Sequence, residues 1–261
     1  MMKSQIEQKL EGLGVPRELT AQAISLLPES VDALLLYGSR ARGDEVGDSD
    51  LDLLALVKEP RITLHEGSVA LSFYTEAQLM TGISSLFGAH LARDAQLLWD
   101  PSGRLAACLD GMGRVDTDRV VRRARHFAQV LGAQERDLPK YLPGLLREAK
   151  YLLRSCLYAE AIAADRACFS VREIASRYND PRLAGLLASR PAGFDARSDL
   201  EECCARLERI IGPLPNNRHG SLEALIVNEW GEDDELVSMA LLALGGSNVD
   251  ADYTEVDKVL L

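Results

Sequence analysis

The sequence predicts an α+β protein in which a small β-sheet domain is followed by an all-helical domain. Short apolar segments bounded by turn residues, which are typical of strands, occur in the first 115 residues. From Thr117 onward, apolar residues recur at helical spacing almost everywhere. Such a change is typical of two domains. We expect them at residues 1–115 and 116–245, followed by an acidic tail at 246–261 that is ordered only if it docks.

The first domain is expected to begin with two helices and to continue with strands. The helices are predicted at residues 4–12 and 16–27, and the strands at 31–37, 51–57 and 68–74. Residues 62–65 are expected to belong to an edge strand or to a hairpin that leads into the third strand. Thr75, with Gln78 three residues later, resembles a capping box and predicts a helix over 75–87. The segment AQLLWDPSGRL predicts one more strand, a turn and the start of a helix.

The second domain is expected to consist of helices alone. Asp116 or Thr117 is expected to cap a helix that ends near Gly132, and residues 139–164 are expected to form a long helix. Two further capping boxes are predicted, one at Ser170 with Glu173 and one at Ser198 with Glu201.

The composition excludes several classes of function. The net charge of −11 argues against bulk binding to nucleic acid or to an anionic membrane, since both require a basic surface. No run of 18 apolar residues predicts a transmembrane helix, and the N-terminus has no signal-peptide core. The five cysteines show no metal-binding spacing, which favours reduced thiols in the cytoplasm.

The segment YGSRARGDEVGDSDLDLL, residues 37–54, contains a pair of acidic residues on one side of a predicted strand. Asp50 and Asp52 share a face because alternate side chains of a strand point the same way. Two unpaired carboxylates this close repel each other. A divalent cation such as Mg²⁺, which prefers carboxylates, phosphate oxygens and water, removes this cost. The pair is therefore predicted to bind a metal.

The residues before the acidic pair are predicted to bind phosphate. Gly38 allows the backbone to approach a ligand closely, and Ser39 offers a hydroxyl and an N–H group at the start of a helical turn. Arg40 and Arg42 are expected to add positive charge. The segment is neither a P-loop nor a dinucleotide fingerprint, because it has no GK[ST] and no GxGxxG.

These residues resemble the core motif of the DNA polymerase β superfamily of nucleotidyltransferases, especially its minimal and aminoglycoside-modifying members. The resemblance implies a small mixed sheet flanked by helices, Mg²⁺ (or Mn²⁺), and transfer of a nucleoside monophosphate from an NTP, usually ATP. It assigns the phosphate-binding turn to Gly38 and Ser39, and the metal-binding pair to Asp50 and Asp52. The helical second half is similar to the domain that completes the cleft in the aminoglycoside-modifying members.

The sequence departs from the family in one respect. Many members carry a third carboxylate on a following strand, but SVALSFYT contains none. Glu66, just before this strand, is the first candidate for the missing catalytic acid, followed by Glu76 and, more weakly, Glu148.

One basic residue of the second domain is also a candidate for the site. Arg147, Lys150 and Arg154 share one face of the long helix, which is either a solvated basic face or a contact for phosphate. Lys150 is the residue expected to bind phosphate.

Two functions remain open at this point. The first is an active nucleotidyltransferase that acts on a hydroxyl or phosphate acceptor, either a small molecule or a protein. An aminoglycoside, an RNA 3′ end or a second nucleotide is also compatible with the motif. The second is a nucleotide-binding regulatory or antitoxin-like module that has lost turnover, which the missing acid favours. The sequence does not indicate an oligomeric state.

Overall fold

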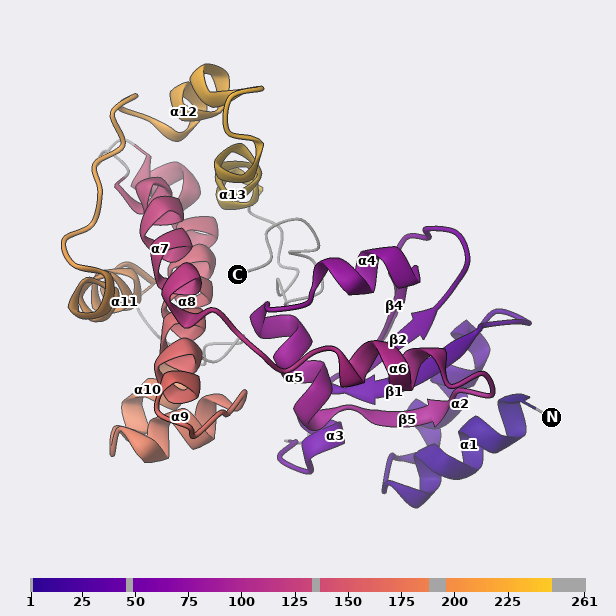
Figure 1. Cartoon of the computed structure of the whole chain (residues 1–261). Coiled ribbons are helices and arrows are strands. Elements are labelled where there is room, and N and C mark those ends of the chain that lie inside the picture. Colours follow the sequence, from indigo (N-terminus) through magenta and orange to yellow (C-terminus); the bar gives the residue numbers. More distant parts are fainter. Residues whose placement is uncertain (1, 46–48, 133–136, 188–195, 246–261) are drawn as a thin grey trace. The chain divides into compact units, whose positions relative to one another are not determined.

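The computed structural model describes residues 2–45, 49–132, 137–187 and 196–245 (Figure 1). The chain divides into two compact units, residues 1–115 and 116–261. The predicted tail at 246–261 lies outside the described residues.

The first unit contains a mixed sheet with helices around it. The strands are β1 (Ala33–Tyr37), β2 (Leu51–Leu56), β3 (Leu64–Glu66), β4 (Val69–Tyr74) and β5 (Gln96–Trp99). The helices are α1 (Met2–Gly12), α2 (Arg17–Leu26), α3 (Gly38–Arg42), α4 (Glu76–Thr81), α5 (Leu86–Asp94) and α6 (Arg104–Asp110). The strand order is β3-β4-β2-β1-β5, in which β2 and β4 are parallel and the other neighbours are antiparallel. The predicted α+β class with a small mixed sheet is confirmed.

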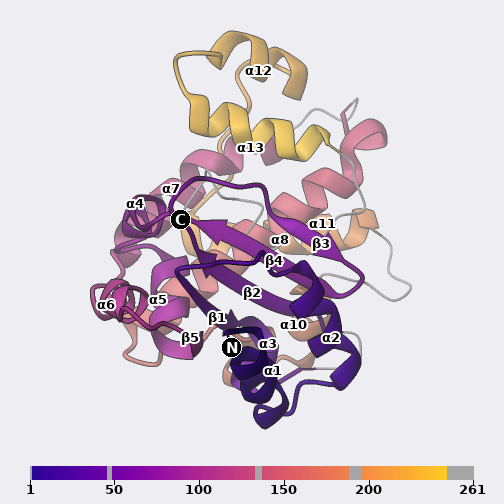
Figure 2. The same ribbon diagram turned by 90° about the vertical axis from the view of Figure 1, so that its right-hand side faces the viewer.

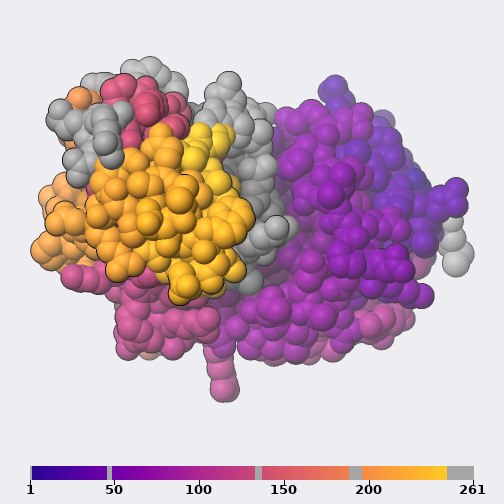
Figure 3. Space-filling view, turned by 90° about the horizontal axis from the view of Figure 1, so that it is seen from above, coloured from indigo at the N-terminus to yellow at the C-terminus, as the bar shows by residue number. Residues whose placement is uncertain are grey.

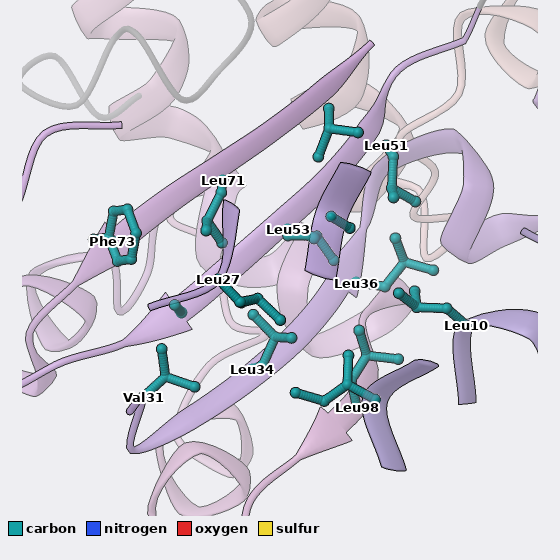
Figure 4. Packing of buried hydrophobic residues seen from close by; sticks show 14 of the residues in the cluster. Leu10, Leu27, Val31, Leu34, Leu36, Leu51, Leu53, Leu71, Phe73 and Leu98 are labelled. Carbon is teal, nitrogen blue, oxygen red and sulfur yellow. The ribbon is translucent and has the colours of Figure 1, made fainter. Parts of the chain in front are cut away.

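One face of the sheet forms the main core of this unit. Alternate residues of each strand point to this face. On β2, Leu51 and Leu53 pack there against Ile6 and Leu10 of α1 and Ala23 of α2. Figure 4 shows this packing from close by, and Figure 2 shows α1 and α2 against the sheet. The two helices are apolar at helical spacing for this reason.

The other face of the sheet is covered in part by α5. The ring of Phe87 lies 6.1 Å from the ring of Tyr37 and 5.8 Å from that of Tyr74, so one phenylalanine bridges β1 and β4. Asp52 belongs to this face because it alternates with Leu51 and Leu53. The acidic residue therefore points away from the main core.

The predicted helix over 75–87 is wrong, because the segment forms two helices. The capping box of Thr75 and Gln78 is confirmed at the start of α4, but the helix ends at Thr81. Ser84 has a φ of 70°, which a continuous right-handed helix does not allow, and the Ser85 hydroxyl caps the new helix α5. This break starts α5 where it can reach β1.

The described part of the second unit is helical. Its elements are α7 (Thr117–Phe127), a 3₁₀ turn η1 (Ala128–Leu131), α8 (Leu138–Ala163), α9 (Val171–Arg177), α10 (Pro181–Leu187), α11 (Ala196–Ile211), α12 (Leu222–Glu229) and α13 (Asp234–Leu244). The long helix α8 is central, and α7, α11 and α13 pack against it. Residues of α12 and α13, orange to yellow in Figure 3, form one continuous surface of this unit.

The predicted caps of the second unit have different outcomes. Asp116 caps α7 and Ser170 caps α9, as predicted. Ser198 is not a cap, because α11 already begins at Ala196. Ser198 therefore lies within the helix, which begins before the start that the sequence predicts.

Two global predictions concern membranes and cysteines. Within the described ranges, we find no helix with the length and apolar character needed to cross a membrane. All five cysteines lie in these ranges, and none forms a disulfide bond.

Candidate functional site

The predicted phosphate turn joins the end of β1 to the short helix α3. Tyr37 is the last residue of β1 and has an extended backbone. Gly38 follows with a φ of 77°, a conformation that L side chains rarely adopt. Gly43 ends α3 in the same left-handed region, with a φ of 73°. The two glycines therefore let the chain turn sharply into and out of one helical turn.

Gly38 lies directly against Asp52. A Cβ atom at Gly38 would stand 2.3 Å from Oδ2 of Asp52. The register explains this closeness, because Tyr37 is paired with Asp52 across the antiparallel strands β1 and β2. The predicted phosphate turn and the predicted metal pair thus meet at one end of the sheet, although ten residues separate Ser39 from Asp50 in sequence.

The two acidic residues lie at the start of β2. Asp50 immediately precedes the strand and Asp52 is its second residue. Both are half-buried. Residues 46–48 of the loop that leads to them lie outside the described residues. Alternation along the extended chain places the two side chains on the same face, as the sequence predicts.

Arg40 and Arg42 have protein partners in this structure. Arg40 donates two hydrogen bonds, from Nε at 3.1 Å and Nη2 at 2.7 Å, to the carbonyl oxygen of Ser49. It thereby ties α3 to the residue just before Asp50. Arg42 donates to Oδ1 of Asp44 at 3.2 Å and lies 2.9 Å from Nε2 of His90. Its side chain is only 14% exposed, so its main contacts hold α3 against α5.

A buried polar cluster on α5 was not predicted from the sequence. His90 lies between Arg42 and the ring of Tyr37, with a ring separation of 6.2 Å from the latter. Asp94 lies 3.6 Å from both Arg42 and His90. Burial raises the pKa of Asp94, and the nearby Arg93 and Arg42 oppose this shift. The i, i+4 spacing of His90 and Asp94 was the available signal, but both residues lie beyond the predicted helix over 75–87.

No acid stands beside Asp52 on β4. The parallel pairing places Ala70 opposite Asp52, and the antiparallel pairing places His65 of β3 opposite Ala70. Glu66 is paired with Val69, which belongs to the main core on the other face. The first candidate for the third acid is therefore on the opposite face of the sheet from Asp52.

Glu76 also lies away from the acidic pair. It follows β4 and forms a salt bridge with Arg104 of α6. Because β2 and β4 are parallel, the end of β4 lies beside the end of β2, whereas Asp52 is near its start. Tyr74 is four residue steps along β4 from Ala70, roughly 13 Å along the sheet.

The remaining two candidates belong to the helical unit. Glu148 is 1% exposed and forms a salt bridge with Arg147 at 3.1 Å, and burial raises its pKa to about 7. Arg147 also donates to the carbonyl oxygen of Leu242 on α13. Lys150 is half-buried. Burial raises the pKa of the Cys203 thiol on α11, and the positive charge of Lys150 opposes this shift. Arg147 of the predicted basic face is thus engaged within the unit, and phosphate binding by Lys150 stays a prediction.

The residues at the start of β2 fit a Mg²⁺ ion that is completed by substrate. The described ranges contain no group of three or more His, Cys, Asp or Glu side chains that could hold a metal. Two carboxylates with phosphate oxygens and water are the ligand set that Mg²⁺ prefers. Because Gly38 has no side chain, the carboxylate of Asp52 can lie against the turn, where a Cβ would collide with it.

Comparison with known families agrees with this geometry. A family described as "Nucleotidyltransferase domain" matches residues 18–90, which extend from α2 to His90 in α5. A search of curated proteins found no significant match to the chain. The predicted resemblance to the polymerase β-like nucleotidyltransferases is therefore confirmed, and it applies to the part of the chain that contains the phosphate turn and both acidic residues.

Proposed function

We propose that this chain, whose residues 18–90 form a nucleotidyltransferase domain, is a Mg²⁺-dependent enzyme that transfers NMP from an NTP. ATP is the first candidate for the donor, and the acceptor is a hydroxyl or phosphate group of a small molecule or a protein. The observation that carries the proposal is the contact between Gly38 and Asp52. It brings the predicted phosphate turn next to a carboxylate near the start of β2.

Each residue of the site has a role in this proposal. The backbone of Gly38 and the N–H and hydroxyl groups of Ser39 bind and orient the phosphates. Asp50 and Asp52 hold the metal, which neutralises charge on the phosphates when it is bound. Arg40 acts by fixing the approach to Asp50, since its guanidinium is bonded to Ser49. Positioning and charge neutralisation are the main contributions that such a site makes to catalysis.

The chemistry of the acceptor is supported only by charge. The net charge of −11 favours a cationic small molecule over a long nucleic acid. The absence of disulfide bonds among the five cysteines supports a reducing location such as the cytoplasm.

The experiment that tests the proposal uses ATP labelled at the α-phosphate. The protein is incubated with labelled ATP, Mg²⁺ or Mn²⁺, and a panel of acceptors, and labelled product and pyrophosphate are measured. Asp50→Asn and Asp52→Asn are expected to abolish transfer, whereas Asp110→Asn, an exposed change at the end of α6, leaves it intact. Equal activity in all three variants would contradict the proposal.

A second function is favoured by the residue beside Asp52. Because Ala70 occupies that position, the chain is also compatible with a nucleotide-binding regulatory or antitoxin-like module without turnover. Calorimetry separates the two functions. The module binds Mg²⁺·ATP in a manner that depends on Asp52 but releases no pyrophosphate with any acceptor. The enzyme binds Mg²⁺·ATP and also releases pyrophosphate.

A further inference from the structure

Three side chains lie in one row across three neighbouring strands. Asp52 on β2 is paired with Ala70 on β4, and Ala70 is paired with His65 on β3. Paired residues on neighbouring strands point to the same face of a sheet. His65 therefore shares the face of Asp52, opposite to the main core.

The alternation of β3 supports this orientation independently. Leu64, the preceding residue, is half-buried against the main core, and it is paired with Leu71 of that core. His65 must then point to the other face, and it is exposed. Two strand spacings separate β2 from β3, about 10 Å between the backbones of Asp52 and His65. The residue between them, Ala70, contributes only a methyl group.

We propose that His65 is the general base of the transfer reaction. This inference rests on the proposed function. A base has to lie within reach of the acceptor, close to the metal-binding carboxylates but not among them. Of the three residues on β2, β4 and β3, Asp52 is assigned to the metal and Ala70 has no basic group, which leaves His65 to accept the proton. An imidazole is suited to this role because histidine is the side chain that most often transfers protons in catalysis.

The step is balanced in atoms and charge. The acceptor hydroxyl gives its proton to the unprotonated ring nitrogen of His65 as its oxygen forms a bond to the α-phosphorus. The bond between the α-phosphorus and the bridging oxygen breaks, and pyrophosphate leaves with that electron pair. The protonated imidazole then returns the proton to water.

The charged groups that share the face of His65 include the carboxylates of Asp50 and Asp52, which are assigned to the metal. β3 packs against β4 and α2. Its three partners on β4 are apolar. The helix α2 belongs to the main core on the opposite face, so its charged residues Arg17 and Glu18 do not share the face of His65. On β3 itself, Glu66 points to that opposite face as well.

The test measures transfer and binding in the full-length protein. Labelled ATP with Mg²⁺ is incubated with kanamycin, a tyrosine-containing peptide, or water alone as acceptors. His65→Gln is expected to lower kcat by about 100-fold or more while the Kd for Mg²⁺·ATP stays unchanged. Added imidazole is expected to restore part of the rate of His65→Ala. The acid limb of the pH profile, present in the wild type, is expected to be absent in His65→Gln.

The control variant carries a change outside the proposed site. Glu59→Gln changes an exposed residue in the loop between β2 and β3 and is expected to leave kcat unchanged. The inference is overturned if His65→Gln keeps the wild-type kcat and acid limb, or if Glu66→Gln loses transfer while His65→Gln does not. If the wild type binds ATP but transfers to no acceptor, the proposed function fails as well. If the wild type transfers and His65→Gln equals it, only the role of His65 fails.

Discussion

At the scale of single residues, Gly38 at the start of α3 and Gly43 just after its end allow backbone strain to be distinguished from a specific contact. Gly38 and Gly43 have nearly the same φ, 77° and 73°. A Cβ at Gly38 would meet Asp52 at 2.3 Å, whereas a Cβ at Gly43 would meet no atom within 4 Å. A substitution at either position costs backbone strain of roughly 1–2 kcal/mol, but only one of them disturbs the acidic pair.

Gly38→Ala is therefore expected to weaken binding of Mg²⁺·ATP at least about tenfold, an effect of 1.4 kcal/mol. The added methyl group has to displace the carboxylate of Asp52. Gly43→Ala serves as the control and is expected to lower stability similarly while binding stays within about twofold. Calorimetric titration and urea unfolding of both variants measure these effects. Equal losses of binding in the two variants would show that strain, and not the contact, is responsible.

The sequence identified the residues of this turn more reliably than their partners. Spacing along the chain predicted the shared face of Asp50 and Asp52 and the position of Gly38, because both follow from local backbone geometry. It also predicted that Arg40 and Arg42 assist phosphate binding. The structure shows them bonded to Ser49, Asp44 and His90, and their role in phosphate binding stays a prediction. These partners depend on how loops and α5 return to the turn, which no local pattern records.

Arg42→Lys is expected to destabilise the first unit by roughly 1–3 kcal/mol. The planar guanidinium contacts both Asp44 and His90, whereas one ammonium group cannot reproduce this geometry. Arg93→Lys is the control, because Arg93 also contacts Asp94 but its side chain is 38% exposed. Its expected effect is within about 0.5 kcal/mol. Urea unfolding measures both, and a loss of ATP affinity in Arg42→Lys with unchanged stability would indicate a direct phosphate contact instead.

At the scale of elements, the order of the strands decides which residues meet. β3 and β4 are neighbours in sequence, but β4 is inserted beside β2 in parallel. This arrangement places Ala70 beside Asp52 and sends Glu66 to the opposite face. The sequence predicted the strands individually. It could not give the register between them, because pairing joins residues that are distant along the chain.

The Ala70 position is expected to accept a working carboxylate. In the background of His65→Gln, the additional change Ala70→Asp places an acid next to Asp52 in the same row. We expect it to raise kcat at least about tenfold over His65→Gln alone, since the new carboxylate can take the acceptor proton. The control is Ala70→Asn, which has the same shape as Ala70→Asp without the charge. Val69→Asp is unsuitable because the side chain of Val69 lies in the main core. A rate with Ala70→Asn equal to that with Ala70→Asp would contradict this role.

At the scale of the whole molecule, the two units have separate cores and different architectures. The first unit is built on the sheet with α1 and α2, and the second on α8 with the helices around it. We propose that they are independently folding domains, as the change of pattern near residue 115 indicates. The free energy of unfolding of each domain then depends on pH separately. An ionisable group buried in one domain makes this difference measurable.

Glu148 is expected to make the stability of the helical unit depend on pH. Its carboxyl has a pKa of about 7 in the folded protein and 4.5 as an ordinary glutamic acid, because burial disfavours the charged form. The folded state thus holds the proton more tightly. The stabilising contribution is fully present below pH 4.5 and is lost as the pH rises through 7. The shift corresponds to about 3 kcal/mol between these limits.

Replacing Glu148 by Gln removes this dependence. Glu148→Gln is expected to gain stability relative to the wild type between pH 5 and pH 8, measured by urea unfolding followed by far-UV circular dichroism. Glu223 of α12 is the control in the same unit, because hydrogen bonding from Tyr141 lowers its pKa to about 2. Glu223 stays charged throughout this range, so the effect of Glu223→Gln is expected to be constant. If the two domains fold independently, the pH-dependent difference appears in one unfolding transition only. A difference that moves both transitions together would show that the two units unfold as one.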